Sequence, residues 1–190
     1  THFGFAADYH CWGLNIGRMD LSHEGEYDPV RASTFRHHNH FDLPLTCKSQ
    51  SGNTALLIAE ADLRDYAGLY LRGRNDGLLG VQAQLSFQYE HRQQAVRRTM
   101  TADGVQSPWR VVMMADKAGK LIESNLIANL NPPSAIGDAS WIKPGKAAWD
   151  WWNGPYLPPP AKGAMDTPTF KRFIDFAGES GLEYYLIDEG

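Results

Sequence analysis

The sequence predicts a multi-domain fold in which a β-sandwich is followed by the start of an α/β domain. Short strand-like runs fill residues 1–130 at intervals near the ~8–12 residues typical of a sandwich. Residues 131–143 begin in a stretch rich in Pro and Asn, as expected of a linker. Residues 144–190 have the pattern strand, loop, helix, strand, which indicates a βαβ unit and therefore a parallel sheet.

Turn residues separate the apolar runs of the first domain. Residues 78–87 alternate between apolar and polar side chains, which is the period of a half-buried strand. Leu121, Ile122 and Leu126 have the spacing of one helical face, so a short helix is expected over 119–127. The expected strands are residues 41–46, 54–59, 78–87 and 109–115, and the buried face of 78–87 is expected to hold Leu79, Val81, Ala83, Leu85 and Phe87.

The second domain begins with a strand over 147–152, followed by a loop rich in Pro and Gly. Thr167 is expected to cap the next helix, with Pro168 at its first position. Gly181 is the expected stop, and a buried strand follows over 182–187. The apolar face of the helix comprises Phe170, Phe173, Ile174 and Ala177.

Composition excludes several classes of protein. The chain has 190 residues, of which 43% are hydrophobic and 21% charged, with a formal net charge of -4. This composition is typical of a globular protein, and it offers no basic field for nucleic acid. No apolar run approaches the ~20 residues that cross a bilayer, so no membrane insertion is expected. The N-terminus has neither a Met nor a signal-peptide layout, so we expect either that a leader was removed or that the sequence begins within a longer chain.

The chain contains two cysteines, Cys11 and Cys47, and neither lies in a metal-ligand spacing. Sparse cysteines favour two unpaired thiols. A single disulfide is the alternative if the protein is exported.

The segment SWIKPGKAAWDWWNG (140–154) has an unusual density of aromatic residues. Trp faces pack against the apolar faces of sugar rings, while Asp and Asn bind hydroxyl groups. Barrel core or interdomain packing is the other interpretation. Because side chains alternate along a strand, at most about half of these residues should reach a cleft. The candidate substrate-binding residues here are Trp149, Asp150, Trp152 and Asn153.

Other polar residues stand at strand ends. Asp188 and Glu189 follow the last strand, where carboxylates can bind hydroxyls or cap a loop. Glu60 directly follows the apolar run TALLIA (54–59). Judged by the composition of this segment alone, Glu60 is expected to be a carboxylate at the surface. The HHNH run at 37–40 matches no standard zinc spacing and is expected to be a solvated loop.

Several motifs together resemble glycoside hydrolase family 97, whose members act mainly as α-glucosidases and α-galactosidases. The match runs almost end to end, and the Trp-rich segment and the final IDEG are its most specific parts. The matching motifs are SHEGEY (22–27), FDLPLT (41–46), IAEADLRDYAGLYL (58–71), SPWRVVMMAD (107–116), SNLIANLNPP (124–133) and TFKRFIDFAGESGLEYYLIDEG (169–190).

The resemblance implies an N-terminal β-super-sandwich and a catalytic (β/α)8 barrel, of which this chain would hold only the first β–α–β unit. It implies an exo-acting α-glycoside hydrolase that binds Ca²⁺ at its active site. The resemblance further implies that one ligand of the ion comes from the first domain. The place of Glu60 in IAEADLRDY assigns that role to it, and a carboxylate is a suitable ligand for Ca²⁺. The catalytic residues are expected beyond Gly190, so this fragment is expected to be inactive alone.

Three further expectations complete the prediction. The partners are an oligosaccharide or α-glycoside substrate and the remainder of the same polypeptide. The family implies a periplasmic or secreted location. The alternative function is a non-catalytic carbohydrate-binding β-sandwich. The βαβ unit argues against it, because a binding module of this kind does not require an additional pair of parallel strands. The motifs leave glucoside or galactoside, and inversion or retention, open.

Overall fold

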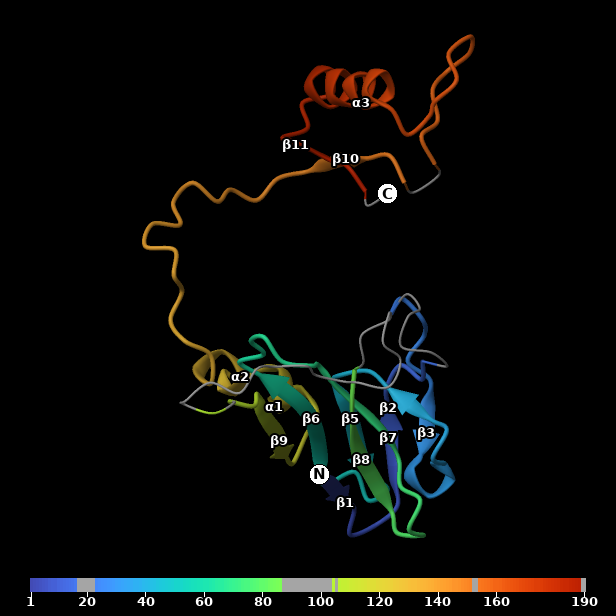
Figure 1. Cartoon of the computed structure of the whole chain (residues 1–190), viewed down its shortest axis with the longest axis vertical. Coiled ribbons are helices and arrows are strands. Elements are labelled where there is room, and N and C mark those ends of the chain that lie inside the picture. The colour runs from blue at the N-terminus through green and yellow to red at the C-terminus, as the bar shows by residue number, and fades with distance from the viewer. Residues whose placement is uncertain (17–22, 87–103, 105, 152–153, 189–190) are drawn as a thin grey trace. The chain divides into compact units, whose positions relative to one another are not determined.

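The chain divides into two units, Thr1–Pro133 and Ser134–Gly190 (Figure 1). Among the helices that the structure describes, none combines the length and apolarity needed to cross a bilayer. The structure is a computed structural model, and it describes all residues except 17–22, 87–103, 105, 152–153 and 189–190.

Unit 1 contains two antiparallel sheets within its described residues. One sheet has the order β1 (His2–Gly4), β8 (Gly80–Leu85), β7 (Leu69–Gly73) and β4 (His40–Phe41). The other has the order β3 (Pro29–Arg31), β2 (Tyr9–Trp12), β5 (Leu45–Ser49), β6 (Ala55–Ala61) and β9 (Trp109–Ala115). A 3-10 helix, η1 (Ala32–Thr34), follows β3.

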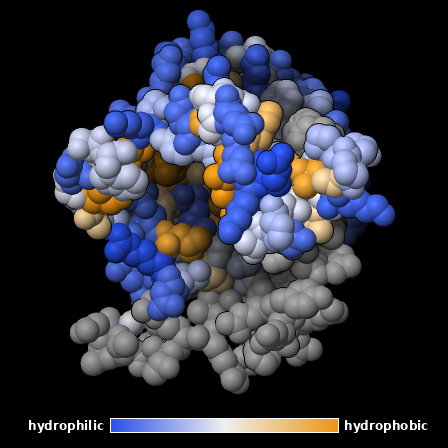
Figure 2. All heavy atoms as spheres, turned by 90° about the horizontal axis from the view of Figure 1, so that it is seen from above, coloured by the Kyte–Doolittle hydropathy of each residue, from blue (hydrophilic) through white to orange (hydrophobic). Residues whose placement is uncertain are grey.

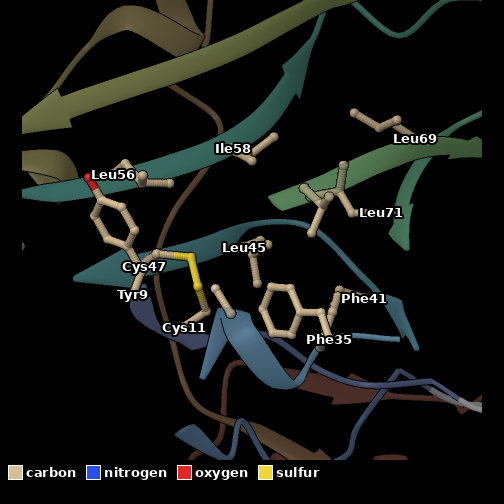
Figure 3. Packing of buried hydrophobic residues seen from close by; sticks show 12 residues of the cluster. Tyr9, Cys11, Phe35, Phe41, Leu45, Cys47, Leu56, Ile58, Leu69 and Leu71 are labelled. Atoms are coloured by element: carbon tan, nitrogen blue, oxygen red, sulfur yellow. A yellow bond between two sulfur atoms is a disulfide. The ribbon is translucent and has the colours of Figure 1, made fainter. Parts of the chain in front are cut away.

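The main core lies between these two sheets (Figure 3). Leu45 and Ile58 of the five-stranded sheet pack with Leu71 and Val81 of the four-stranded sheet, and all four are at most 1% exposed. Val81 is therefore buried as the alternation of 78–87 predicted, whereas Phe87 lies outside the described residues. The rest of this cluster is Tyr9, Cys11, Ala32, Phe35, Phe41, Cys47, Leu56 and Leu69.

A second, smaller core covers the opposite face of β6 and β9. Leu121 of α1 (Gly119–Ile122) is buried there, and Ile127 of α2 (Leu126–Asn129) packs against the same cluster. The expected single helix is thus two short ones, and Ile122 is 89% exposed rather than part of a shared face. The cluster is built on Ala55, Ala59, Ala61, Val111, Met113 and Leu121.

The expected strand 41–46 is wrong as a single element. Phe41 ends β4 in the four-stranded sheet, and Leu45 begins β5 in the five-stranded sheet. Pro44 lies between them, and proline cannot donate the hydrogen bond that a continuous strand would need. The segment therefore passes from one sheet to the other, and both ends of it reach the core. The strand expected over 109–115 is confirmed as β9.

Cys11 and Cys47 form a disulfide, so the preference for two free thiols was wrong. The two residues are direct partners in the antiparallel pairing of β2 with β5, and both are at most 1% exposed. Figure 3 shows the bond inside the main core. The sequence separation of 36 residues gave no sign of this pairing, because register is a property of the folded sheet.

Unit 2 is a strand–helix–strand unit. Its strands, β10 (Ala147–Trp149) and β11 (Tyr184–Leu186), pair in parallel, and α3 (Thr167–Glu179) connects them. Both strands are shorter than the runs 147–152 and 182–187 that were expected. The helix packs on one face of the pair, where Phe173 stacks on Tyr185 with ring centroids 5.7 Å apart.

The ends of α3 follow local chemistry. Its N-cap is Asp166 rather than the expected Thr167, since the Asp166 carboxylate accepts the backbone N–H of Thr169 at 2.9 Å. Gly181 has a φ of +66°, as expected for the residue that stops a helix. The Leu182 N–H then donates to the Ala177 carbonyl at 2.8 Å, which closes the C-terminal turn.

Gly80 is expected to tolerate no side chain. Its φ is +124°, and a Cβ would lie 2.1 Å from the Phe3 carbonyl oxygen of the neighbouring strand β1. We expect Gly80→Ala to cost roughly 2 kcal/mol or more, because strain and a backbone clash add. Gly77→Ala is the matched control, with a φ of +78° and open space around its Cβ. Chemical denaturation of both variants tests this; equal losses would contradict it.

Candidate functional site

Glu60 is the second-last residue of β6 (Ala55–Ala61), and its side chain joins the two sheets. Its Oε2 accepts the backbone N–H of Leu69, the first residue of β7, at 3.0 Å. Its Oε1 contacts the guanidinium of Arg110, which lies directly opposite it on β9. The Glu60 side chain is 8% exposed and that of Arg110 is 18% exposed. Glu60 is therefore a buried, paired carboxylate and not the surface residue that composition alone indicated.

The loop after Glu60 has unusual backbone geometry. Asp62 and Asp65 have φ values of +53° and +45°, a region that L-residues seldom adopt. The backbone N–H of Asp62 donates to the Asn131 side chain at 3.0 Å, which ties this loop to the segment after α2. A pocket of about 600 Å³ opens beside it, lined by Leu43, Pro44, Leu57, Ala59, Glu60, Ala61, Asp62, Leu63, Met113, Ile127 and Asn131.

The contacts of Glu60 would still allow its carboxylate to serve as one ligand of a metal ion. Each carboxylate oxygen keeps a free lone pair after its present contact, and Ca²⁺ takes 6–8 oxygen ligands. Among the described residues, no group of three or more His, Cys, Asp or Glu side chains could hold a metal ion. As the structure stands, Arg110 neutralises the Glu60 carboxylate.

A second polar cluster joins three segments that sequence reasoning left apart. His23 Nδ1 lies 2.7 Å from Asp42 Oδ2, and the Tyr70 hydroxyl lies 3.5 Å from His23 Nε2. Burial and the nearby Asp42 carboxylate raise the pKa of Tyr70. His23 and Asp42 lie in SHEGEY and FDLPLT, but their pairing could not be predicted because 19 residues separate them.

The expected sugar-binding residues of unit 2 lie on different faces of the β10–β11 pair. Asp150 is 1% exposed, and it accepts a hydrogen bond of 2.7 Å from the Tyr185 hydroxyl. Since Phe173 of α3 stacks on Tyr185, this carboxylate belongs to the helix side. Its buried Oδ1 has no hydrogen-bond partner among the described residues. Desolvation and the Asp150 carboxylate raise the pKa of Tyr185.

The other face of the pair carries exposed aromatic and aliphatic residues. Trp149 is 38% exposed, Tyr184 45% and Leu186 52%. Trp151 is also exposed, and Asp188 is partly exposed just after β11. Figure 2 shows hydrophobic residues at the surface of the molecule only in small patches between hydrophilic ones in that view. Trp152, Asn153 and Glu189 lie outside the described residues.

Residues 1–133 match the family model described as Glycosyl-hydrolase 97 N-terminal. This chain belongs to glycoside hydrolase family 97. The family assignment that the motifs predicted is confirmed, and the match covers all of unit 1.

Two curated relatives are named as a retaining and a probable retaining α-galactosidase. The chain is 32% identical over 182 residues to a retaining α-galactosidase of Bacteroides thetaiotaomicron, covering 89% of this chain and 27% of the relative. It is 32% identical over 142 residues to a probable retaining α-galactosidase of Streptomyces bingchenggensis, covering 74% of this chain and 20% of that protein. The chain thus spans about a quarter of the length of these relatives.

Solved structures of family 97 also match. A family 97 enzyme from Pseudoalteromonas sp. strain K8 in complex with acarbose has a TM-score of 0.67 and 28% identity, covering 99% of this chain and 28% of that one. A variant of the same enzyme in complex with panose matches equally well. The described part of this family 97 chain is mostly β, as expected of a β-sandwich N-terminal domain.

Proposed function

We propose that this chain is the N-terminal part of a retaining, exo-acting α-galactosidase. The similarity to the retaining α-galactosidase of Bacteroides thetaiotaomicron carries this proposal, since it extends over 89% of the chain and so includes both units. Hydrolysis of an α-glucoside is the second candidate, because the enzyme that matches at 28% identity was solved with the oligosaccharides acarbose and panose.

Unit 2 would be the first β–α–β unit of a (β/α)8 barrel. The parallel pairing of β10 with β11 and the helix on one face support this assignment. In such a barrel the face opposite the helices becomes the interior, and active sites form at the C-terminal ends of the strands. Trp149 is on that face at the end of β10, and Asp188 follows β11. The same proposal includes Trp152, Asn153 and Glu189 as substrate-binding residues.

These residues would have different roles in binding the substrate. Trp149 would present its flat ring to the apolar face of a sugar, and Asp188 would accept hydrogen bonds from sugar hydroxyls. Asp150 would act as a positioning residue, because its hydrogen bond to Tyr185 holds the end of β10 against β11. The acid and the nucleophile of a retaining mechanism would come from later barrel strands, placed about 5 Å apart.

The complete enzyme would bind Ca²⁺, with Glu60 as the ligand from the first domain. The ion would supply positive charge to the active site, which favours negatively charged oxygens. The Leu69 amide and Arg110 would hold the Glu60 carboxylate in one orientation. A periplasmic or secreted location is part of the same proposal, because the buried disulfide suits an oxidising compartment.

The complete enzyme is expected to hydrolyse 4-nitrophenyl α-galactoside faster than the α-glucoside. Hydrolysis should fall after treatment with a calcium chelator and return on addition of Ca²⁺. Proton NMR of the first product should show the α-anomer, because a retaining enzyme inverts the anomeric carbon twice. A folded enzyme that releases nothing from either substrate would instead favour a non-catalytic carbohydrate-binding protein.

A further inference from the structure

The outer face of the five-stranded sheet carries a pocket over β2, β3 and β5. Cys11 and Cys47 point into the core, so their neighbours His10, Trp12 and Lys48 point outward from β2 and β5. The pocket has a volume of about 390 Å³ and is lined by His10, Trp12, Arg31, Lys48, Ser49, Gln50 and Gly52.

Three basic side chains form a row across this pocket. His10 is the direct partner of Arg31 on one side and of Lys48 on the other. Like charges gathered on one face of a sheet repel one another, so the two permanent cations of this row, Arg31 and Lys48, favour a counter-charge. Asp8 binds Arg31, with its Oδ2 3.0 Å from Nε and 2.9 Å from Nη2.

Lys48 differs from Arg31 in this respect. Among the described residues it has no acidic partner, and no acidic residue is among those that line the pocket. Lys48 and His10 are both exposed, so their polar atoms are open to a ligand. The pocket therefore has an excess of positive charge that suits an anion.

Trp12 supplies the apolar part of the same pocket. It is the next outward residue after His10 on β2, opposite Pro29 on one side and Thr46 on the other. The Trp12 side chain is 37% exposed, which leaves part of a flat ring uncovered beside the basic row. An indole face next to cationic groups matches a ligand with an apolar ring face and a negative charge.

We propose that this pocket binds an acidic saccharide. The pyranose ring would stack on Trp12, and its carboxylate would accept hydrogen bonds from Lys48 and His10. The choice of a saccharide rests on the proposed function, whereas the requirement for a negative charge rests on the pocket itself. The complete enzyme would thereby hold an acidic glycan through its first domain.

Calorimetric titration of the complete enzyme with trigalacturonic acid tests this proposal, with maltotriose as the neutral probe. We expect trigalacturonic acid to bind at least tenfold more tightly than maltotriose and to lose affinity in high salt. Trp12→Ala and Lys48→Met should each weaken binding by roughly tenfold or more. Lys117→Met, an exposed lysine after β9, and Trp109→Ala, at the far edge of the sheet, should leave it unchanged.

Several results would overturn the proposal. These are no binding of trigalacturonic acid, equal binding of maltotriose, or binding that neither Trp12→Ala nor Lys48→Met weakens. Lys48 is exposed, so its replacement leaves the fold intact and keeps the test informative if Trp12→Ala unfolds. Hydrolysis of 4-nitrophenyl α-galactoside by the wild-type enzyme is measured in parallel. An active enzyme that does not bind trigalacturonic acid contradicts this inference but leaves the proposed function standing.

Discussion

Glu60→Gln in the complete enzyme is expected to lower calcium affinity roughly tenfold or more, and hydrolysis with it. The amide keeps the shape of the side chain and can still accept the Leu69 N–H, but it lacks the negative charge that attracts Ca²⁺. Calorimetry gives the calcium affinity, and release of 4-nitrophenol gives the activity. Glu123→Gln changes an exposed glutamate at the end of α1 and should alter neither.

The same substitution leaves Arg110 without its partner. Burial lowers the pKa of the Arg110 guanidinium, and Glu60 is the acidic group paired with it. Removing one partner of a buried ion pair costs on the order of 3 kcal/mol. The double variant Glu60→Gln with Arg110→Met removes both charges and should recover most of that stability.

The two variants separate metal binding from folding. If Glu60 binds calcium, the double variant is stable but still lacks the calcium affinity. Wild-type calcium affinity in the double variant would remove Glu60 from the metal site, and the ion pair would then be purely structural. Thermal unfolding with and without Ca²⁺ supplies the stability of each variant.

Loss of the Cys11–Cys47 disulfide is expected to cost the first unit about 3–4 kcal/mol. The bond joins residues 36 positions apart. It lowers the conformational entropy of the unfolded chain, so unfolding is less favourable while the bond is intact. Denaturant unfolding of the wild-type protein, with and without a reducing agent, measures the difference. The Cys11→Ala, Cys47→Ala double variant should match the reduced protein, apart from the cavity that the missing sulfur atoms leave.

The reducing agent supplies its own control. It should destabilise the wild-type protein and leave the double variant unchanged, because the chain has only these two cysteines. Equal stability of the oxidised and reduced wild-type protein would contradict a structural role for the bond. It would also remove the support that the bond gives to an exported location.

Local signals in the sequence predicted the elements well where one segment holds all the information. The strand 109–115 and the stop of α3 at Gly181 are confirmed, since a run of β-formers and a positive φ are local properties. The start of α3 was wrong by one residue, because Asp166 and Thr167 are both good caps and only the geometry selects Asp166. The crossing of the chain from one sheet to the other at Pro44 was not predicted. The apolar residues on its two sides belong to different sheets, and the sequence pattern does not distinguish this from a single strand.

The sequence by itself determined the family, the β character of the first unit and the strand–helix–strand order of the second. Periodicity and motifs carry those properties, and both are read along the chain. Only the tertiary structure decided which side chains meet. Sheet register placed Arg110 opposite Glu60, joined Cys11 to Cys47 and aligned His10 with Lys48. Packing of α3 placed Asp150 on the helix side and left Trp149 exposed on the other. Contacts between distant segments depend on how strands pair, and a shift of one residue would turn every one of these side chains to the opposite face.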